Sequence, residues 1–323
     1  MLNYPDPEEI DATRRLLDAY IRRTPCVTVR SRELGDAEVD CEFIFKLELF
    51  QVTGTFKPRG ALSVMLNLSS DERARGVTAV SAGNHAIAVA YAARAIGTTA
   101  KVVMIQTANP ARLERARSYG AEIELAGDGP SAFRRTKEIE IEEGRTFVHP
   151  FEGPRTVLGT GTLGVEWLEQ SRELDAVVVA IGGGGLIAGV GAAIKQTSPK
   201  TAVYGVEPVG ADSMSRSFAA GVPVSLDSVS TIADSLAPPM ATPYTFGVCK
   251  RFVDEIVLVS DIQMRRAMAV LFKELKICVE PAGAASLAAA IGPLRSSIRG
   301  MRVGILVCGS NIDLPTFTAQ VSL

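Results

Sequence analysis

The stretch Val52-Thr53-Gly54-Thr55-Phe56-Lys57-Pro58-Arg59-Gly60-Ala61 places a lysine directly before Pro-Arg-Gly. Proline suits the first turn of a helix, because its missing N–H has no partner there. The run therefore predicts that Lys57 opens a helix beside Phe56. A lysine between a positive helix end and an apolar ring should lose proton affinity, as a Schiff-base lysine requires. A surface lysine on an amphipathic helix explains this run alone equally well.

Two further runs have a strand, a glycine turn and a helix in succession. Val77–Ser81 is typical of a buried strand, and it leads through Ala82-Gly83 into a small-residue helix from Asn84. Ala176–Ile181 leads into four glycines, Gly182 to Gly185. Such turns offer backbone N–H groups to an anion, and glycine lets the backbone approach it closely. The glycine run is followed by no Lys-Ser/Thr pair, and the signal for a dinucleotide site is weak. An ordinary βα turn remains the alternative.

Together the three runs resemble the fold-type II pyridoxal-phosphate enzymes, in the branch of serine/threonine dehydratases (threonine ammonia-lyases) and serine racemase. The resemblance covers essentially the whole chain and implies an α/β fold of the tryptophan synthase β-subunit-like type. Two parallel-sheet domains would hold pyridoxal 5'-phosphate in the cleft between them. The large cofactor-binding domain would comprise residues 1–60 and 149–323, and the small inserted domain residues 61–148. The matching segments are Thr55–Ala61, Ser81–His85, Gly182–Leu186, Glu280–Ala284 and Cys308–Asn311.

The apolar pattern agrees with this fold, because strands and helices alternate along the chain as in parallel sheets covered on both faces. We expect strands at residues 42–47, 77–81, 101–105, 122–125, 176–181, 202–206, 256–259 and 303–307. We expect helices within residues 1–21 and at 111–119, 130–143, 162–171, 261–276 and 282–291.

The resemblance also implies roles for single residues. Lys57 matches the lysine that carries the cofactor and moves the Cα proton, and Asn84 matches the residue that binds the cofactor's 3′-oxygen. The loop with Ser81, Ala82, Gly83 and His85 would receive the substrate carboxylate. The remaining cofactor contacts are expected from Phe56, Gly182, Gly183, Gly184, Gly185, Leu186, Glu280 and Cys308.

Cys308 falls where the family has a Ser or Cys opposite the pyridine nitrogen. A neutral thiol cannot protonate the ring as an aspartate would, so the ring is a weaker electron sink, which favours β-elimination over transamination. A buried cysteine at a strand end, with no role in cofactor binding, is the alternative.

Several positions depart from the family pattern. Racemases of this branch have a second serine where this chain has Ala82, so we expect racemisation to be minor. The family's usual Ala-Asp-Gly is replaced here by Ala233-Asp234-Ser235, so the sequence does not identify the substrate. A metal pattern of some relatives ends here in Ser213, so a Mg²⁺ or Ca²⁺ site on Glu207 and the Ala211 carbonyl would lack a carboxylate. A strand-end glutamate before a proline is the alternative.

Composition limits the partners and the location. The 323-residue chain has a net charge of −2, so we expect no nucleic-acid partner. Its five cysteines lack C-x-x-C spacing, which indicates reduced thiols in a cytoplasmic protein. The uncharged segment Ala176–Ile194 contains four central glycines and has charged flanks, which favours a buried strand and helix over a membrane span. We also expect a homodimer, no signal peptide and no appended regulatory domain.

The function indicated is β-elimination from a small β-hydroxy amino acid, with L-threonine and L-serine first, giving a 2-oxo acid and ammonia. A lyase acting on 3-hydroxyaspartate or on a hydroxyectoine-derived amino acid remains an alternative. A cysteine synthase-like β-replacement transferase is another, although those enzymes usually have Gly-Asn-Thr where this chain has Gly83-Asn84-His85. Lys57 argues against a non-catalytic binding protein on the same scaffold.

Overall fold

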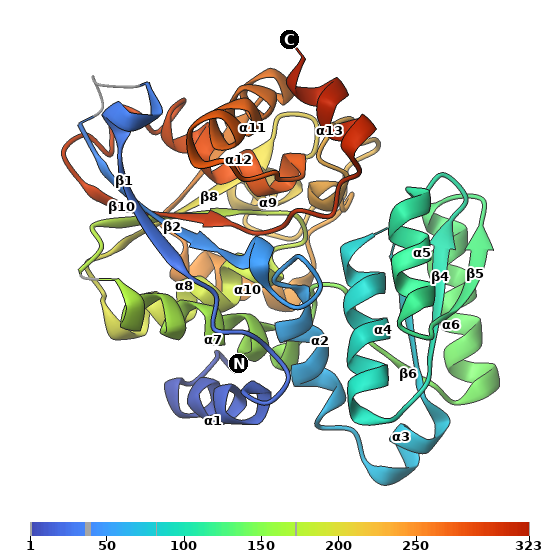
Figure 1. The fold of residues 1–323 in the computed structure, drawn as a ribbon. Helices are drawn as coiled ribbons and strands as arrows, with labels where there is room; N and C mark the ends of the chain where they lie inside the picture. The colour runs from blue at the N-terminus through green and yellow to red at the C-terminus, as the bar shows by residue number, and fades with distance from the viewer. Residues whose placement is uncertain (1, 36–39, 82, 172, 323) are drawn as a thin grey trace.

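The computed structural model describes residues 2–35, 40–81, 83–171 and 173–322 and contains two β-sheets flanked by helices (Figure 1). The larger sheet has the strand order β1-β2-β10-β7-β8-β9, and the smaller has β5-β4-β3-β6. The strands of the larger sheet are β1 (Cys26–Arg30), β2 (Glu42–Leu47), β7 (Ala176–Ala180), β8 (Ala202–Pro208), β9 (Glu255–Val259) and β10 (Arg302–Val307). Those of the smaller sheet are β3 (Val77–Val80), β4 (Ala100–Ile105), β5 (Glu122–Ala126) and β6 (Thr146–Phe147).

The expected parallel α/β architecture is confirmed, with one antiparallel pair. All the strands predicted from the sequence are present, with ends within two residues of those expected. Two further strands were not predicted. The edge strand β1 pairs antiparallel with β2 and is mostly exposed, and β6 has only two residues. Neither gives a hydrophobic period that a sequence reading can detect.

Helices surround both sheets and provide the two turns that matter for the cavity described below. Helix α2 begins at Lys57 with Pro58 in its first turn, as predicted. The helices are α1 (Pro7–Leu17), α2 (Lys57–Met65), α3 (Ser70–Arg75), α4 (Asn84–Ile96), α5 (Pro110–Ser118), α6 (Gly129–Glu143), α7 (Pro154–Gln170), α8 (Gly185–Thr197), α9 (Ser213–Ala220), α10 (Pro243–Phe252), α11 (Asp261–Leu275), α12 (Pro281–Ala290) and α13 (Leu314–Val321). Short 3₁₀ turns are η1 (Ser31–Leu34), η2 (Glu48–Phe50) and η3 (Asp234–Leu236).

Helix α7 starts at residue 154 rather than at residue 162, where the sequence analysis began it. Its glycines weaken the helical signal in the sequence, but in the fold they allow close helix packing. A Cβ at Gly159 would lie 2.3 Å from the Arg59 carbonyl oxygen of α2, and one at Gly164 would lie 2.8 Å from the Ala193 Cβ of α8. These glycines therefore fix α2, which begins at Lys57, against the larger sheet's helices.

Each sheet has its own hydrophobic core. Trp167, Phe43 and Phe45 belong to the core of the larger sheet, whereas Val77 and Met104 belong to that of the smaller. Strands β3–β6 and helices α3–α6 lie together on one side of the molecule (Figure 1). The domain boundaries given above stay a prediction, and they fall where the chain passes between these two cores.

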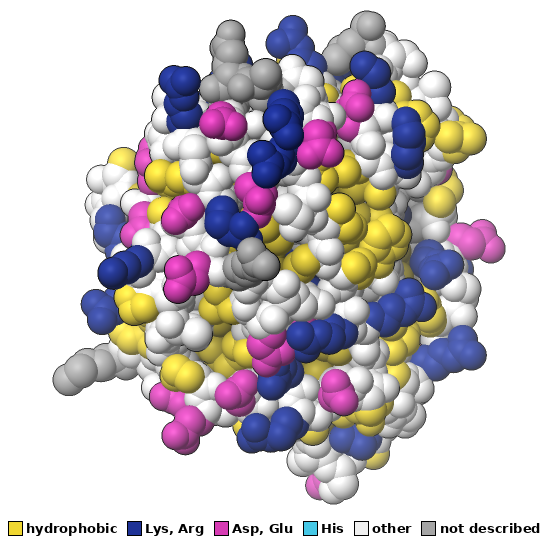
Figure 2. Space-filling model, turned by 60° about the vertical axis from the view of Figure 1, so that its left-hand side comes forward, with side chains coloured by type: hydrophobic (Ala, Val, Ile, Leu, Met, Phe, Trp, Pro, Cys, Tyr) yellow, Lys and Arg dark blue, Asp and Glu magenta, His cyan; other side chains and the backbone are white. Residues whose placement is uncertain are grey.

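The surface and the helices agree with a low net charge and a packed interior. None of the described helices has both the length and the apolar character needed to cross a membrane. The uncharged segment 176–194 forms β7 and most of the buried helix α8. On the face drawn in Figure 2, positive and negative side chains are interspersed among apolar ones.

Candidate active site

A cavity of about 280 Å³ lies between the two sheets, at the carboxyl ends of β3, β4, β7 and β10. Ligands of parallel α/β sheets bind at this edge. All the described residues predicted to contact cofactor or substrate line the cavity, although their roles remain predictions. They are Phe56, Lys57, Ser81, Gly83, Asn84, His85, Gly182, Gly183, Gly184, Gly185, Leu186, Glu280 and Cys308. Ala82, the position of the missing racemase serine, lies outside the described residues.

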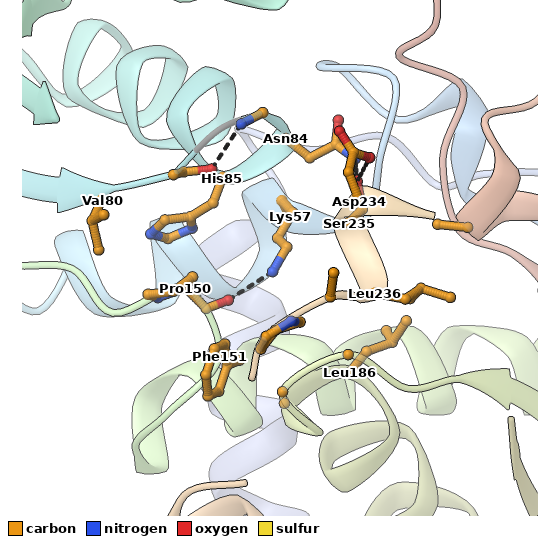
Figure 3. A pocket seen from close by; sticks show the side chains of 18 of the residues that line it. Lys57, Val80, Asn84, His85, Pro150, Phe151, Leu186, Asp234, Ser235 and Leu236 are labelled. Atoms are coloured by element: carbon orange, nitrogen blue, oxygen red, sulfur yellow. Dashed lines mark hydrogen bonds between the residues drawn. The ribbon is translucent and has the colours of Figure 1, made fainter. Parts of the chain in front are cut away.

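Lys57 reaches into the middle of this cavity (Figure 3). Its Nζ donates a hydrogen bond of 2.7 Å to the Pro150 carbonyl and lies 5.2 Å from the centre of the Phe56 ring. Burial lowers the pKa of Lys57 to about 8, against the opposing effects of Cys308 and Glu280. The lowered pKa was expected, but its main cause is burial rather than the helix end or the aromatic ring. A neutral amine is therefore accessible near neutral pH.

Two uncharged histidines line the cavity beside Lys57. Nε2 of His85 lies 2.8 Å from the Val148 carbonyl, so this nitrogen carries the hydrogen. Nδ1 of His149 accepts the backbone N–H of Glu152 at 2.9 Å, so its hydrogen is on Nε2. Burial lowers the pKa of His85 to about 3 and that of His149 to about 4. Neither ring therefore adds positive charge next to the lysine.

The glycine turn before α8 forms one wall. Gly184 has a φ of +88° and caps α8 without a side chain, which leaves the helix start open to an anion. A Cβ at Gly183 would lie 2.2 Å from the Phe151 ring, and one at Gly185 would lie 2.3 Å from the Phe151 carbonyl oxygen. Glycine is therefore required for packing here as well as for an open anion cradle. This arrangement fits the phosphate of pyridoxal phosphate.

A second open helix start lies on the wall formed by the smaller sheet. Gly83 caps α4 without a side chain, and its N–H donates to the Ser81 Oγ at 3.0 Å. The first turn of α4, with Asn84 and His85, borders the cavity. The site thus has two uncapped helix starts, which can hold two different anionic groups.

Asn84 is fixed by side chains from the larger-sheet side. Its Nδ2 donates to Glu280 at 2.6 Å and to the Ser235 hydroxyl at 3.2 Å, while its Oδ1 accepts from the Asn311 Nδ2 at 2.8 Å. The second Glu280 oxygen accepts from Arg112 at 3.1 Å. Burial raises the pKa of Glu280 to about 7, and Arg112 opposes this rise. The sequence analysis noted the unusual Ser235 but missed its contact, and it missed Arg112 altogether.

Cys308 is buried beside Glu280 and keeps its proton. Its thiol donates to the Ala282 carbonyl at 3.4 Å, and burial raises its pKa further above the ordinary value. The side chain is thus a neutral thiol, as required by the hypothesis that Cys308 leaves the pyridine ring a weaker electron sink. Whether it faces the pyridine nitrogen stays a prediction.

An aromatic wall was also missed, of which Phe133, His149 and Phe151 line the cavity. Phe133, Phe147, His149 and Phe151 form a chain of edge-to-face contacts, with ring centres 6.5, 5.5 and 4.6 Å apart. Phe133 comes from α6, whereas the other three follow one another at alternate positions from the end of β6. The alternation Phe147-Val148-His149-Pro150-Phe151 was the only available signal. Val80, Val103 and Ile105 of the smaller sheet extend this apolar lining.

The residues proposed for a divalent cation do not make a site on their own. Both oxygens of Glu207 accept backbone N–H groups, from Met214 at 2.9 Å and Ser215 at 2.7 Å, and burial raises its pKa to about 8. Asp212, the nearest replacement carboxylate, pairs with Arg216. Within the described part of the chain, no three His, Cys, Asp or Glu side chains group around a metal position. A cation at this position would have the Ala211 carbonyl and the protonated carboxyl group of Glu207 as ligands, whereas Mg²⁺ and Ca²⁺ take about six or more oxygens.

Comparisons with known proteins agree with this geometry. The chain is 52% identical over 320 residues to phenylserine dehydratase from Ralstonia pickettii, covering 99% of this chain and 97% of that protein. It is 37% identical to L-threonine ammonia-lyase from Thermotoga maritima, over 95% of this chain and 76% of the relative. The structure of maize serine racemase matches with a TM-score of 0.93 at 35% identity, covering 98% of this chain and 97% of the racemase chain. A family model described as pyridoxal-phosphate dependent enzyme matches residues 17–309, and the chain belongs to that family.

Proposed function

We propose that this protein is a pyridoxal 5'-phosphate-dependent dehydratase that converts a β-hydroxy amino acid with an aryl β-substituent into a 2-oxo acid and ammonia. The observation that carries the substrate class is the aromatic wall of Phe133, Phe147, His149 and Phe151. Phe133, His149 and Phe151 border the same cavity as Lys57, and Phe147 packs against Phe133 and His149. Edge-to-face packing is the arrangement by which such a wall would hold another ring. The 52% identity to a phenylserine dehydratase supports this choice.

The site residues divide the work between binding and proton transfer. When bound, the cofactor withdraws electrons from Cα and makes its proton acidic. The glycine turn at Gly184 would hold its phosphate, and Asn84 would donate to its ring oxygen the N–H that bonds the Ser235 hydroxyl in this structure. The uncapped start of α4 binds the substrate carboxylate. Lys57 holds the cofactor and, as a neutral amine, removes the Cα proton, for which a pKa of about 8 is well suited.

The cavity lining also favours an aryl substrate over the alternative substrates. L-threonine and L-serine, first in the sequence-based expectation, fit the same cavity but would leave the wall without a partner. Among the described cavity residues, the cationic side chains are Lys57 and Arg112. Arg112 is already bonded to Asp234 and Glu280, so a substrate with a second carboxylate, such as 3-hydroxyaspartate, would lack a free cation. A homodimer, a cytoplasmic location and the two-domain boundaries are retained as proposals.

A substrate panel on the purified protein tests this function. L-threo-phenylserine, L-threonine, L-serine and 3-hydroxyaspartate are supplied in turn, and the 2-oxo acid is measured. We expect a visible cofactor absorbance band and a kcat/KM for phenylserine about tenfold or more above that for threonine. A preference for threonine or serine would reject the aryl substrate but keep the enzyme class. Absence of the band would reject the class, and rapid use of sulfide with an activated serine would favour the transferase.

A further inference from the structure

Arg112 connects the two sides of the cavity. It lies on α5, which packs with the smaller sheet, and its side chain is only 9% exposed. Its Nε donates to the Asn311 carbonyl at 2.8 Å, Nη1 pairs with Asp234, and Nη2 donates to Glu280 at 3.1 Å. All three partners belong to segments of the larger-sheet side. One guanidinium therefore joins three groups across the cleft.

Of the three partners, Glu280 is the one whose ionisation depends most on Arg112. Its side chain is 2% exposed, and burial and the negative charge of Asp234 favour its neutral form. The groups that favour its ionised form are Arg112, which has the largest effect, the Asn84 amide and Lys57. The remaining titratable neighbour, Cys308, is a protonated thiol. Arg112 is thus the main reason that this buried carboxylate can stay charged near neutral pH.

The charge of Glu280, together with the Asn311 amide, sets the orientation of Asn84. An ionised carboxylate only accepts hydrogen bonds, so it holds the NH₂ group of Asn84 on its side, while Asn311 holds the carbonyl oxygen. A protonated Glu280 would carry a donor of its own and would no longer specify which end of the amide faces it. The hydrogen-bond donor available to the cofactor oxygen would then be lost in part of the molecules.

We propose that Arg112 is a positioning residue, which reaches across the cleft to hold Glu280 ionised and thereby fixes the Asn84 amide toward the cofactor. This inference rests on the proposed function, since it assumes cofactor binding at Lys57. Arg112 is not needed merely to hold the two sides of the cleft together. The neighbouring Asn109 Nδ2 already bonds Asp313 across the same cleft at 2.6 Å. Of these two cross-cleft side chains, only Arg112 brings a charge to the buried carboxylate.

The test compares four variants of the cofactor-loaded enzyme. Arg112→Leu removes the positive charge. Arg112→Lys keeps the charge but lacks the planar guanidinium that bonds several partners at once. Arg112→Leu combined with Glu280→Gln also removes the carboxylate that the charge stabilises. Asn109→Ser is the matched control, because serine still caps α5 but cannot reach Asp313. The readouts are the pH profile of kcat/KM, the cofactor dissociation constant from the visible band, and the Tm.

In Arg112→Leu, we expect the acid limb of the profile to move up by about one pH unit from about 7, with about fivefold lower kcat/KM at pH 7 and weaker cofactor binding. Arg112→Lys should move it less. The double variant should lose the shifted limb, because the glutamine in place of Glu280 does not titrate. Asn109→Ser should leave the limb in place. An unmoved limb in both single Arg112 variants, or a limb that stays shifted in the double variant, would overturn the proposal. A wild-type protein without a visible band would instead reject the proposed function.

Discussion

Replacing Phe133 with alanine should lower activity selectively on an aryl substrate. Phe133 packs edge-to-face on Phe147 with ring centres 6.5 Å apart, and it lies 6.3 Å from the His149 ring. It is 36% exposed and borders the cavity, so one part of the ring remains open to a bound substrate. The substitution removes this surface while the remaining rings of the wall stay in place.

The expected loss has two parts. An edge-to-face partner contributes about 0.5–1.5 kcal/mol beyond its area. Covering about 40 Å² of apolar surface on the two rings adds about 1 kcal/mol. The total of about 1.5–2.5 kcal/mol corresponds to roughly a 10- to 70-fold lower kcat/KM for phenylserine. Threonine does not reach the ring in this arrangement, so its kcat/KM should change by less than about twofold.

Phe133→Leu is the matched control, because leucine keeps most of the apolar surface and loses only the ring. We expect an intermediate loss of about two- to tenfold for phenylserine, from the edge-to-face contribution alone. Both variants are compared on both substrates, with Tm measured to confirm folding. If phenylserine and threonine lose activity equally in Phe133→Ala, the residue supports the fold and does not recognise an aryl group.

Three further predictions use other parts of the site. Lys57→Ala should remove the visible cofactor band and turnover while leaving the Tm of the cofactor-free protein close to wild type; turnover by this variant would contradict the assigned role. Cofactor-free wild type should recombine with pyridoxal phosphate faster as pH rises toward about 8 and then level off, because Lys57 must lose its proton to attack; a rate independent of pH between about 6 and 9 would argue against this amine. Arg59→Leu should lower the free energy of unfolding by about 3–5 kcal/mol, because it leaves Glu48 and Glu166 buried without their cation. Loss of less than about 1 kcal/mol in urea unfolding would mean that Lys46 alone compensates both acids.

Local chemistry explains which parts of the site could be predicted from the sequence. The lysine at the start of α2 and the glycine turns at Gly83 and Gly184 each occur within one short segment. Their residue types are limited by steric and hydrogen-bonding needs that can be read without the rest of the chain. The strand and helix alternation was equally local, so the α/β class was predicted correctly.

The features that were missed depend on contacts between distant segments. Phe133 meets Phe147 only after α6 packs on the smaller sheet, and no motif connects the two residues. Arg112 meets Glu280 across 168 positions, in a cluster with neither a fixed spacing nor a glycine turn. The start of α7 was misplaced for a related reason, since Gly159 is justified only by its contact with α2. The sequence therefore predicted the lysine and the glycine turns that line the cavity better than the aromatic wall.

The balance of charge around Lys57 connects the fold with the proposed chemistry. Burial on both sides of the cleft keeps His85 and His149 neutral, and Arg112 is bonded to two carboxylates. The described cavity groups with a pKa close to neutrality are then Lys57, at about 8, and Glu280, at about 7. As the pH rises above about 7, increasing fractions of the carboxylate are ionised and of the amine are neutral. The same pH range therefore provides both a fixed Asn84 and a lysine able to accept a proton.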